Sequence, residues 1–107
     1  MKNYGAGVII AVKIIKAVHL NDADTCVTLT DFADGGDFVS YIDNGEERII
    51  KVRENIPKWH KMAIAPIEKG GNVYKYGAVI GVALERIEPG YHVHTHNVRS
   101  AGAGIND

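Results

Sequence analysis

The chain has 107 residues, with 12 Lys and Arg against 13 Asp and Glu, and 46% of its residues are hydrophobic. A chain of this length forms one domain around one core, and its apolar fraction excludes a disordered protein. A formal net charge of -1 gives no positive field for nucleic acid or an anionic membrane, so neither is expected as a partner.

The chain begins with an apolar run, Gly5 to Leu20, that Lys13 and Lys16 interrupt. Its uninterrupted part is too short to span a membrane, and no small-residue cleavage pattern follows it. The single cysteine, Cys26, can form no disulfide within the chain, which favours a reducing compartment. These features predict a cytoplasmic protein without a membrane segment.

Short segments rich in β-branched residues alternate with glycine-containing turns, which is typical of an all-β domain. The expected strands, in chain order, are Val8 to Val18, Thr25 to Leu29, Phe38 to Ile42, Arg48 to Val52, Lys61 to Ala65, Val73 to Tyr76, Val79 to Leu84 and Tyr91 to His96. No segment carries a helical period long enough to compete with this assignment. The expected fold class is therefore all-β, with short curled strands joined by hairpins.

The turns between these strands have recognisable sequences. Asn44-Gly45 joins two alternating runs, and both residues tolerate the positive φ of a type I′ hairpin turn. Asp34 to Asp37 and Glu68 to Gly71 are two further glycine turns, each of which follows a short apolar segment and precedes a strand. These turns predict a compact domain rather than one large flat sheet.

Three histidines alternate with other residues at His92, His94 and His96. On a strand such spacing would project all three imidazoles from one face. Neutral imidazole binds zinc, iron or copper and titrates near neutral pH, so this face could hold a metal, bind an anion or move a proton. A solvated polar face explains the same pattern, and the spacing alone leaves these alternatives open.

Other polar residues stand close to expected strand ends. His60 and Lys61 begin one strand, Lys75 and Tyr76 end another, and Arg99 follows the histidines. Lysine and arginine in such positions bind carboxylates or phosphates, and arginine does so through two parallel bonds. A solvated strand end accounts for each of these residues equally well.

Three motifs then follow in a specific order: Ile56-Pro57 with His60-Lys61; Val73 with Lys75-Tyr76-Gly77 and Ile80-Gly81; and Ile87, Pro89-Gly90, Val93-His94, His96-Asn97 and Arg99. This series closely resembles the N-terminal SAF domain of the altronate and galactarate dehydratase family, from about residue 14 to Arg99. The resemblance implies a SAF-type β-clip domain over residues 14–99. It leaves residues 1–13 as an N-terminal extension or extra edge strand and residues 100–107 as a flexible tail.

The resemblance implies a hydro-lyase of carbohydrate metabolism. The chain would be the small subunit of a two-subunit altronate or galactarate dehydratase, inactive without a large catalytic subunit and acting on a sugar acid. The implied cofactor is Fe(II) or another divalent metal, whether held by this chain alone or only with the large subunit. A homo-oligomer is left open.

The implied site residues follow the matched motifs. The catalytic set is His60, Lys61, His96 and Asn97; the substrate-binding set is Lys75, Tyr76 and Arg99; the metal ligands are His94 and His96. The family usually has glycine where this chain has Trp59, and a positive φ at that position would strain a tryptophan.

Three alternatives compete with the dehydratase interpretation. The chain is also similar to the α subunit of (2R)-sulfolactate sulfo-lyase, which eliminates sulfite instead of water. SAF-type domains also serve as non-catalytic modules that bind carbohydrate or assemble complexes, because fold alone does not fix function. A metal protein that acts alone through its histidines is the third alternative.

Overall fold

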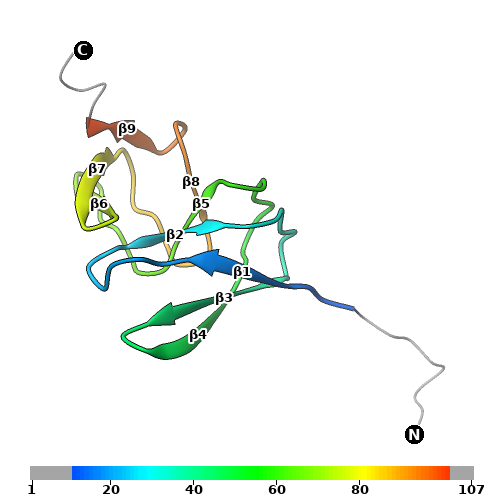
Figure 1. Ribbon diagram of the computed structural model, residues 1–107. Coiled ribbons are helices and arrows are strands. Elements are labelled where there is room, and N and C mark those ends of the chain that lie inside the picture. The colour runs from blue at the N-terminus through cyan, green and yellow to red at the C-terminus, as the bar shows by residue number, and fades with distance from the viewer. Residues whose placement is uncertain (1–10, 102–107) are drawn as a thin grey trace, which may run out of the picture.

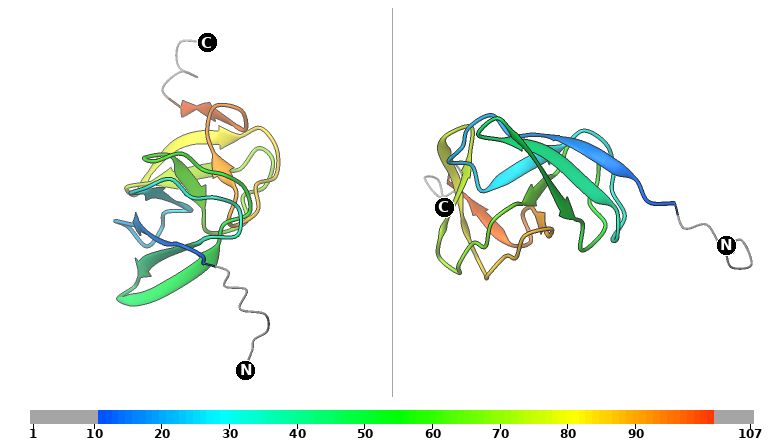
Figure 2. Two further views of the ribbon diagram at one scale, coloured as in Figure 1. Left: turned by 90° about the vertical axis from the view of Figure 1, so that its right-hand side faces the viewer. Right: turned by 90° about the horizontal axis from the view of Figure 1, so that it is seen from below.

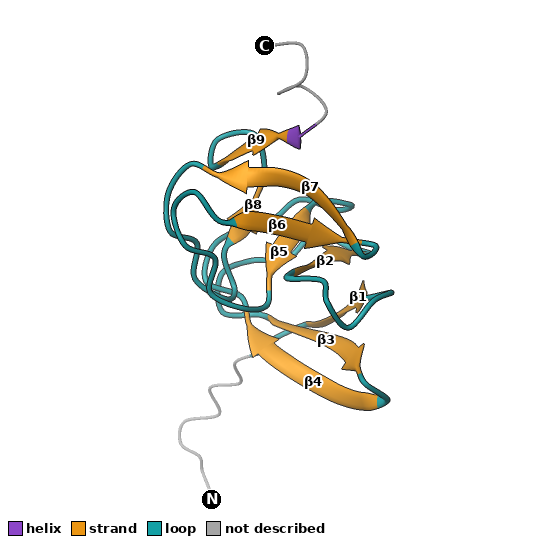
Figure 3. Ribbon diagram, turned by 90° about the vertical axis from the view of Figure 1, so that its left-hand side faces the viewer, coloured by secondary structure: helices purple, strands orange, loops and turns teal. Residues whose placement is uncertain are grey.

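The computed structural model describes residues 11–101 and shows an all-β domain, which confirms the expected fold class (Figures 1 and 3). Its strands are β1 (Ile14–Val18), β2 (Cys26–Leu29), β3 (Phe38–Asp43), β4 (Glu46–Lys51), β5 (Lys61–Ala63), β6 (Asn72–Lys75), β7 (Ala78–Ala83), β8 (His92–Val93) and β9 (Val98–Ser100). Within this described part of the chain, no helix is long and apolar enough to cross a membrane.

The strands form two sheets. The larger has the order β4-β3-β1-β2-β5-β8, and the smaller has the order β6-β7-β9. Only the β1–β3 pair is parallel among the described strand pairs; the others are antiparallel. The β3–β4 hairpin and the smaller sheet lie at opposite ends of the domain in Figure 1, and the strands curl strongly when seen from below in Figure 2.

Most of the expected strands form with bounds that differ by at most two residues, and larger differences occur at three places. The strand expected from Tyr91 to His96 ends at Val93, and β9 was not predicted because three residues carry no recognisable pattern. Of the strand expected from Val8, the part from Ile14 forms; residues 1–10 and 102–107, with most of the expected extension and tail, lie outside the described residues. The Asn44-Gly45 turn has φ values of 51° and 82°, as a type I′ turn requires.

Alternate residues of β2 and β5 belong to two hydrophobic cores instead of the single core expected from chain length. Val27, Leu29 and Met62 pack in the first core, while Cys26 and Ala63 pack in the second. Successive side chains of a strand point to opposite faces, so these two central strands contribute to both cores. The β5–β8 pairing is therefore held by packing in both cores. The candidate site is built on this pair of strands.

One type of tight turn occurs four times between residues 11 and 101. In each, the fourth residue donates its N–H to the carbonyl of the first, as in Asp37 to Asp34 (3.0 Å) and His60 to Pro57 (3.1 Å). The third residue has positive φ, as in a type II turn. These third residues are Gly36 (φ 99°), Trp59 (φ 67°), Gly70 (φ 81°) and Gly90 (φ 92°). The expected strain at Trp59 is therefore present, in a position that glycine occupies in the other three turns.

Replacing Trp59 with glycine is expected to raise the free energy of unfolding by about 1 kcal/mol, because the left-handed backbone costs a non-glycine residue about that much. The indole is 61% exposed, so its loss removes little packing. Urea unfolding measures the change. Lys58→Gly, one residue earlier in the same turn, is the control and should lower stability. A Trp59→Gly variant less stable than the parent chain would show that this turn stores no strain.

Candidate metal and anion-binding site

Three histidines meet at the end of the β5–β8 ladder. The ladder pairs Lys61 with Val93 and Met62 with His92. One further step of this register places His60 opposite His94, on the same face as His92. The ring centroids of His60 and His94 are 4.3 Å apart, and those of His60 and His92 are 5.0 Å apart. We call His60, His92 and His94 the imidazole triad.

The donor atoms of the triad suit a divalent transition metal. One ring nitrogen from each histidine lies within 4.8 Å of the other two. Nδ1 of His60 is 2.8 Å from Nε2 of His92, so one of these rings donates to the other in the absence of an ion. Three imidazole nitrogens with an open fourth position form the ligand set of many catalytic metal sites. The residues present therefore fit the metal that the sequence motifs imply.

His96 lies apart from this ligand set, although the sequence pattern pairs it with His94. The strand ends at Val93, and residues 94–97 form a turn, so the alternation of side chains stops before His96 is reached. The His96 side chain is exposed, and its ring centroid lies 5.1 Å from that of His92. The structure thus brings His94 together with His60 and His92, and places His96 at the edge of the cluster.

Asn97 holds the turn that presents His92 and His94. Its side chain is buried: Oδ1 accepts the His94 N–H at 2.9 Å, and Nδ2 donates to the His92 carbonyl at 2.7 Å. Both ends of the amide are used within the turn. Asn97, expected in the catalytic set, is therefore placed as a positioning residue for the triad.

The environment of the triad disfavours protonated imidazole. Burial, and after it the neighbouring His60, His96 and His94, together lower the pKa of His92 to about 4. The pKa of His94 is lowered as well, mainly by burial and then by His60 and Lys61. Both rings are neutral at pH 7, the state in which imidazole binds a metal.

The metal-free chain is expected to lose stability as the pH falls from about 6.5 to about 4. The pKa of His92 is about 4 in the folded chain, against 6.5 for an unperturbed histidine, so the unfolded chain binds the extra proton in this window. The stabilisation is fully present above pH 6.5. Histidine NMR titration with a chelator present checks this, and a His92 midpoint near the unperturbed value would contradict it.

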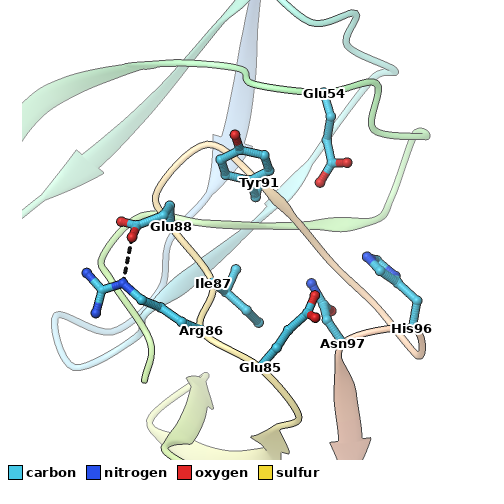
Figure 4. A pocket seen from close by; sticks show the side chains of 8 residues that line it. All are labelled: Glu54, Glu85, Arg86, Ile87, Glu88, Tyr91, His96 and Asn97. Atoms are coloured by element: carbon cyan, nitrogen blue, oxygen red, sulfur yellow. Dashed lines mark hydrogen bonds and ion pairs between the residues drawn. The ribbon is translucent and has the colours of Figure 1, made fainter. Parts of the chain in front are cut away.

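Two pockets flank the triad. The first, which we call the acidic pocket, has a volume of about 350 Å³ and is lined by Glu54, Glu85, Arg86, Ile87, Glu88, Tyr91, His96 and Asn97 (Figure 4). Glu54 also accepts the backbone N–H of His92 at 3.0 Å. The carboxylates of Glu54, Glu85 and Glu88 all line this pocket and would repel an anionic substrate.

The second, which we call the lysine pocket, has a volume of about 450 Å³ and is lined by Thr28, Trp59, Lys61, Lys75, Tyr76, Ile80, Val93, His94, Thr95, Val98 and Ser100. Two lysines give it the charge that a carboxylate requires, and His94 joins it to the triad. Lys61, Lys75 and Tyr76 thus line one pocket together. Arg99 does not line this pocket, because Val98 and Ser100 face it and strand residues alternate.

Asp24 has a role that the sequence pattern does not indicate. Asp24 is 5% exposed and accepts the N–H groups of Tyr76 and Gly77, both at 2.8 Å. These two residues have φ values of 55° and 75°. Asp24 therefore holds the β6–β7 turn that carries Tyr76, and no local sequence signal marks a contact across 52 residues.

Two further titratable residues lie outside the triad. The ring of His19 is bonded to the carbonyl of Ile42 at 2.8 Å. Its donor atom lies within 4.8 Å of carboxylate oxygens of Asp22 and Asp43 rather than with the triad. Cys26 is a free, buried cysteine, and burial raises the pKa of its thiol to about 11. An unreactive thiol of this kind contributes to packing.

The fold and the site together define an all-β domain in which a histidine cluster borders a pocket that two lysines line. The chain belongs to the family described as the altronate/galactarate dehydratase SAF domain, whose family model matches residues 15–101. This match covers every strand except the first residue of β1.

Similar proteins fall into two groups. The chain is 42% identical to altronate dehydratase of Escherichia coli over 83 residues, which are 78% of this chain and 16% of that protein. It is 31% identical to (2R)-sulfolactate sulfo-lyase subunit alpha of Chromohalobacter salexigens over 85 residues, 78% of this chain and 90% of that subunit. The same subunit of Paracoccus pantotrophus is 38% identical over 58 residues, 54% of this chain and 85% of that subunit. The chain therefore spans a small part of the dehydratases and nearly the whole of a lyase subunit.

Proposed function

We propose that this chain is the small subunit of a two-subunit dehydratase that acts on a sugar acid in the cytoplasm. The observation that carries the proposal is the imidazole triad, which shares His94 with a pocket containing Lys61 and Lys75. The relatives support a lyase: 42% identity favours a dehydratase of altronate. A larger catalytic chain would complete the site, since this domain offers no enclosed cleft of its own among residues 11–101.

The proposed chemistry is the elimination of water from a hydroxy acid. A proton leaves the carbon beside the carboxylate, and the hydroxyl on the next carbon departs. Lys61, Lys75 and Tyr76 would bind the substrate. His96 would transfer a proton during the elimination. His60, His92 and His94 would hold Fe(II) or another divalent ion, which supplies charge stabilisation for the anionic intermediate.

A second candidate is a sulfo-lyase subunit. The chain covers 90% of the sulfolactate sulfo-lyase alpha subunit, against 16% of altronate dehydratase. The triad would again hold the metal ion and the lysine pocket would again bind the substrate, because both reactions begin with a hydroxy acid and differ in the group that leaves.

Activity assays separate these candidates. The chain, alone and co-purified with a large dehydratase-like chain, would be assayed with altronate, galactarate and sulfolactate. We expect no turnover by the chain alone and turnover of a sugar acid by the complex. Turnover of sulfolactate instead would support the second candidate. Turnover by the chain alone would overturn the small-subunit proposal, and full activity of a complex that carries both His94→Ala and His96→Ala would indicate a non-catalytic module.

A further inference from the structure

The floor of the lysine pocket is a row of residues from three neighbouring strands. Thr28 of β2 is the register partner of Lys61 of β5, which is in turn the partner of Val93 of β8. All three line the pocket, and Lys75 reaches it from the end of β6. Lys61 and Lys75 therefore line one pocket together with an apolar neighbour on the cross-strand row.

Thr28 brings an unsatisfied hydroxyl to this row. Its Oγ1 is buried and has no hydrogen-bond partner within residues 11–101. Thr30, two residues later, donates its hydroxyl to the Lys16 carbonyl at 2.6 Å. A buried hydroxyl without a partner is destabilising, so Thr28 marks a place where an acceptor is missing. Beside two lysines, an anionic oxygen is the acceptor that fits.

Two strained aromatic residues stand at the same pocket. Trp59 and Tyr76 have φ values of 67° and 55°, and their exposed fractions are 61% and 55%. Burial therefore does not offset the cost of their left-handed backbone. Non-glycine residues held in this way concentrate at ligand-binding positions, and both of these line the pocket.

We propose that the lysine pocket is a carboxylate subsite in which the Thr28 hydroxyl and the ammonium groups of Lys61 and Lys75 bind the carboxylate of a hydroxy acid. Trp59 covers the carbon chain of that ligand. His94 borders both the pocket and the triad, so a carboxylate bound here directs the next carbons toward the imidazoles. The choice of a hydroxy acid rests on the proposed function, whereas the preference for an anion rests on the pocket alone.

An NMR titration of the full chain tests the subsite. The probe is altronate, and altritol is its uncharged match. We expect altronate to shift the amide signals of Thr28, Lys61 and Tyr76, and altritol to leave them in place. Lys61→Gln should weaken altronate binding about tenfold, since a charge-assisted bond is lost. Lys69→Gln, an exposed lysine outside the pocket, is the matched control and should bind like the parent chain.

Thr28→Val separates ligand binding from a structural role. Removing a hydroxyl that has no partner should leave the melting temperature equal or higher, while altronate binding weakens about fivefold. A lower melting temperature with unchanged binding would overturn the role of Thr28. Equal shifts with altritol, or shifts confined to Glu54 and His96 of the acidic pocket, would overturn the subsite.

The two proposals fail independently. If the chain binds altronate at Thr28 and Lys61 but supports no turnover in any complex, the subsite stands and the lyase assignment is wrong. If the complex is active while the chain shows no shift at this pocket, the lyase assignment stands and the subsite is wrong.

Discussion

A His94→Ala variant of the active two-chain complex is expected to lose at least about 100-fold in turnover. Changes to the groups that merely orient metal ligands cost about 10–100-fold, and His94 is placed as a ligand itself. It also borders the lysine pocket, so its loss affects both the proposed ion and the bound substrate. Steady-state rates with altronate, measured on complexes of equal composition, give the ratio.

His19→Ala is the matched control for this experiment. His19 is also half-buried, and its ring is bonded to a backbone carbonyl, but it lies outside the triad and both pockets. Its variant should retain turnover within about twofold, after correction for any loss of folded protein. Equal losses in the two variants would mean that His94 acts through stability and not through the site.

An Asp24→Ala variant is expected to lower the free energy of unfolding by about 3 kcal/mol. The substitution removes two charge-assisted bonds from a buried carboxylate and leaves the N–H groups of Tyr76 and Gly77 without their acceptor. Urea unfolding measures the loss. Since the same turn carries Tyr76 into the lysine pocket, altronate binding should weaken as well.

Asp22→Ala provides the comparison for Asp24. Asp22 is exposed and accepts one N–H, that of Asn44, at 3.1 Å. Its removal should cost about 1 kcal/mol or less. If the Asp22 and Asp24 variants were equally destabilised, the buried carboxylate would not be what holds the β6–β7 turn.

Much of the fold could be predicted because its strands are local patterns closed by recognisable turns. Asn44-Gly45 marked the β3–β4 hairpin, and positive φ at both residues confirms it. Only two of the four type II turns were predicted, because the other two lack a pair of adjacent glycines. At Trp59 the rule that such a turn takes glycine argues against the turn, and the family resemblance alone indicated a positive φ there.

The site was harder to predict than the fold because its contacts are long-range. The His92 and His94 spacing was informative, but the end of β8 at Val93 separates His96, and nothing local shows that. The partner that completes the triad, His60, comes from 32 residues away through the β5–β8 register. Thr28 and Asp24 gave no signal, since their significance depends on a missing partner and on a distant turn.

Metal titration of the purified, chelator-treated chain tests the central claim, that His92 of β8, His94 just after it and His60 just before β5 form one site. With Fe²⁺ under anaerobic conditions, and with Zn²⁺ as a second probe, we expect one ion per chain. Alanine at His60, His92 or His94 should each weaken binding at least about tenfold, and His96→Ala should leave it nearly unchanged. Undiminished binding in His60→Ala, or loss only in His96→Ala, would contradict this account.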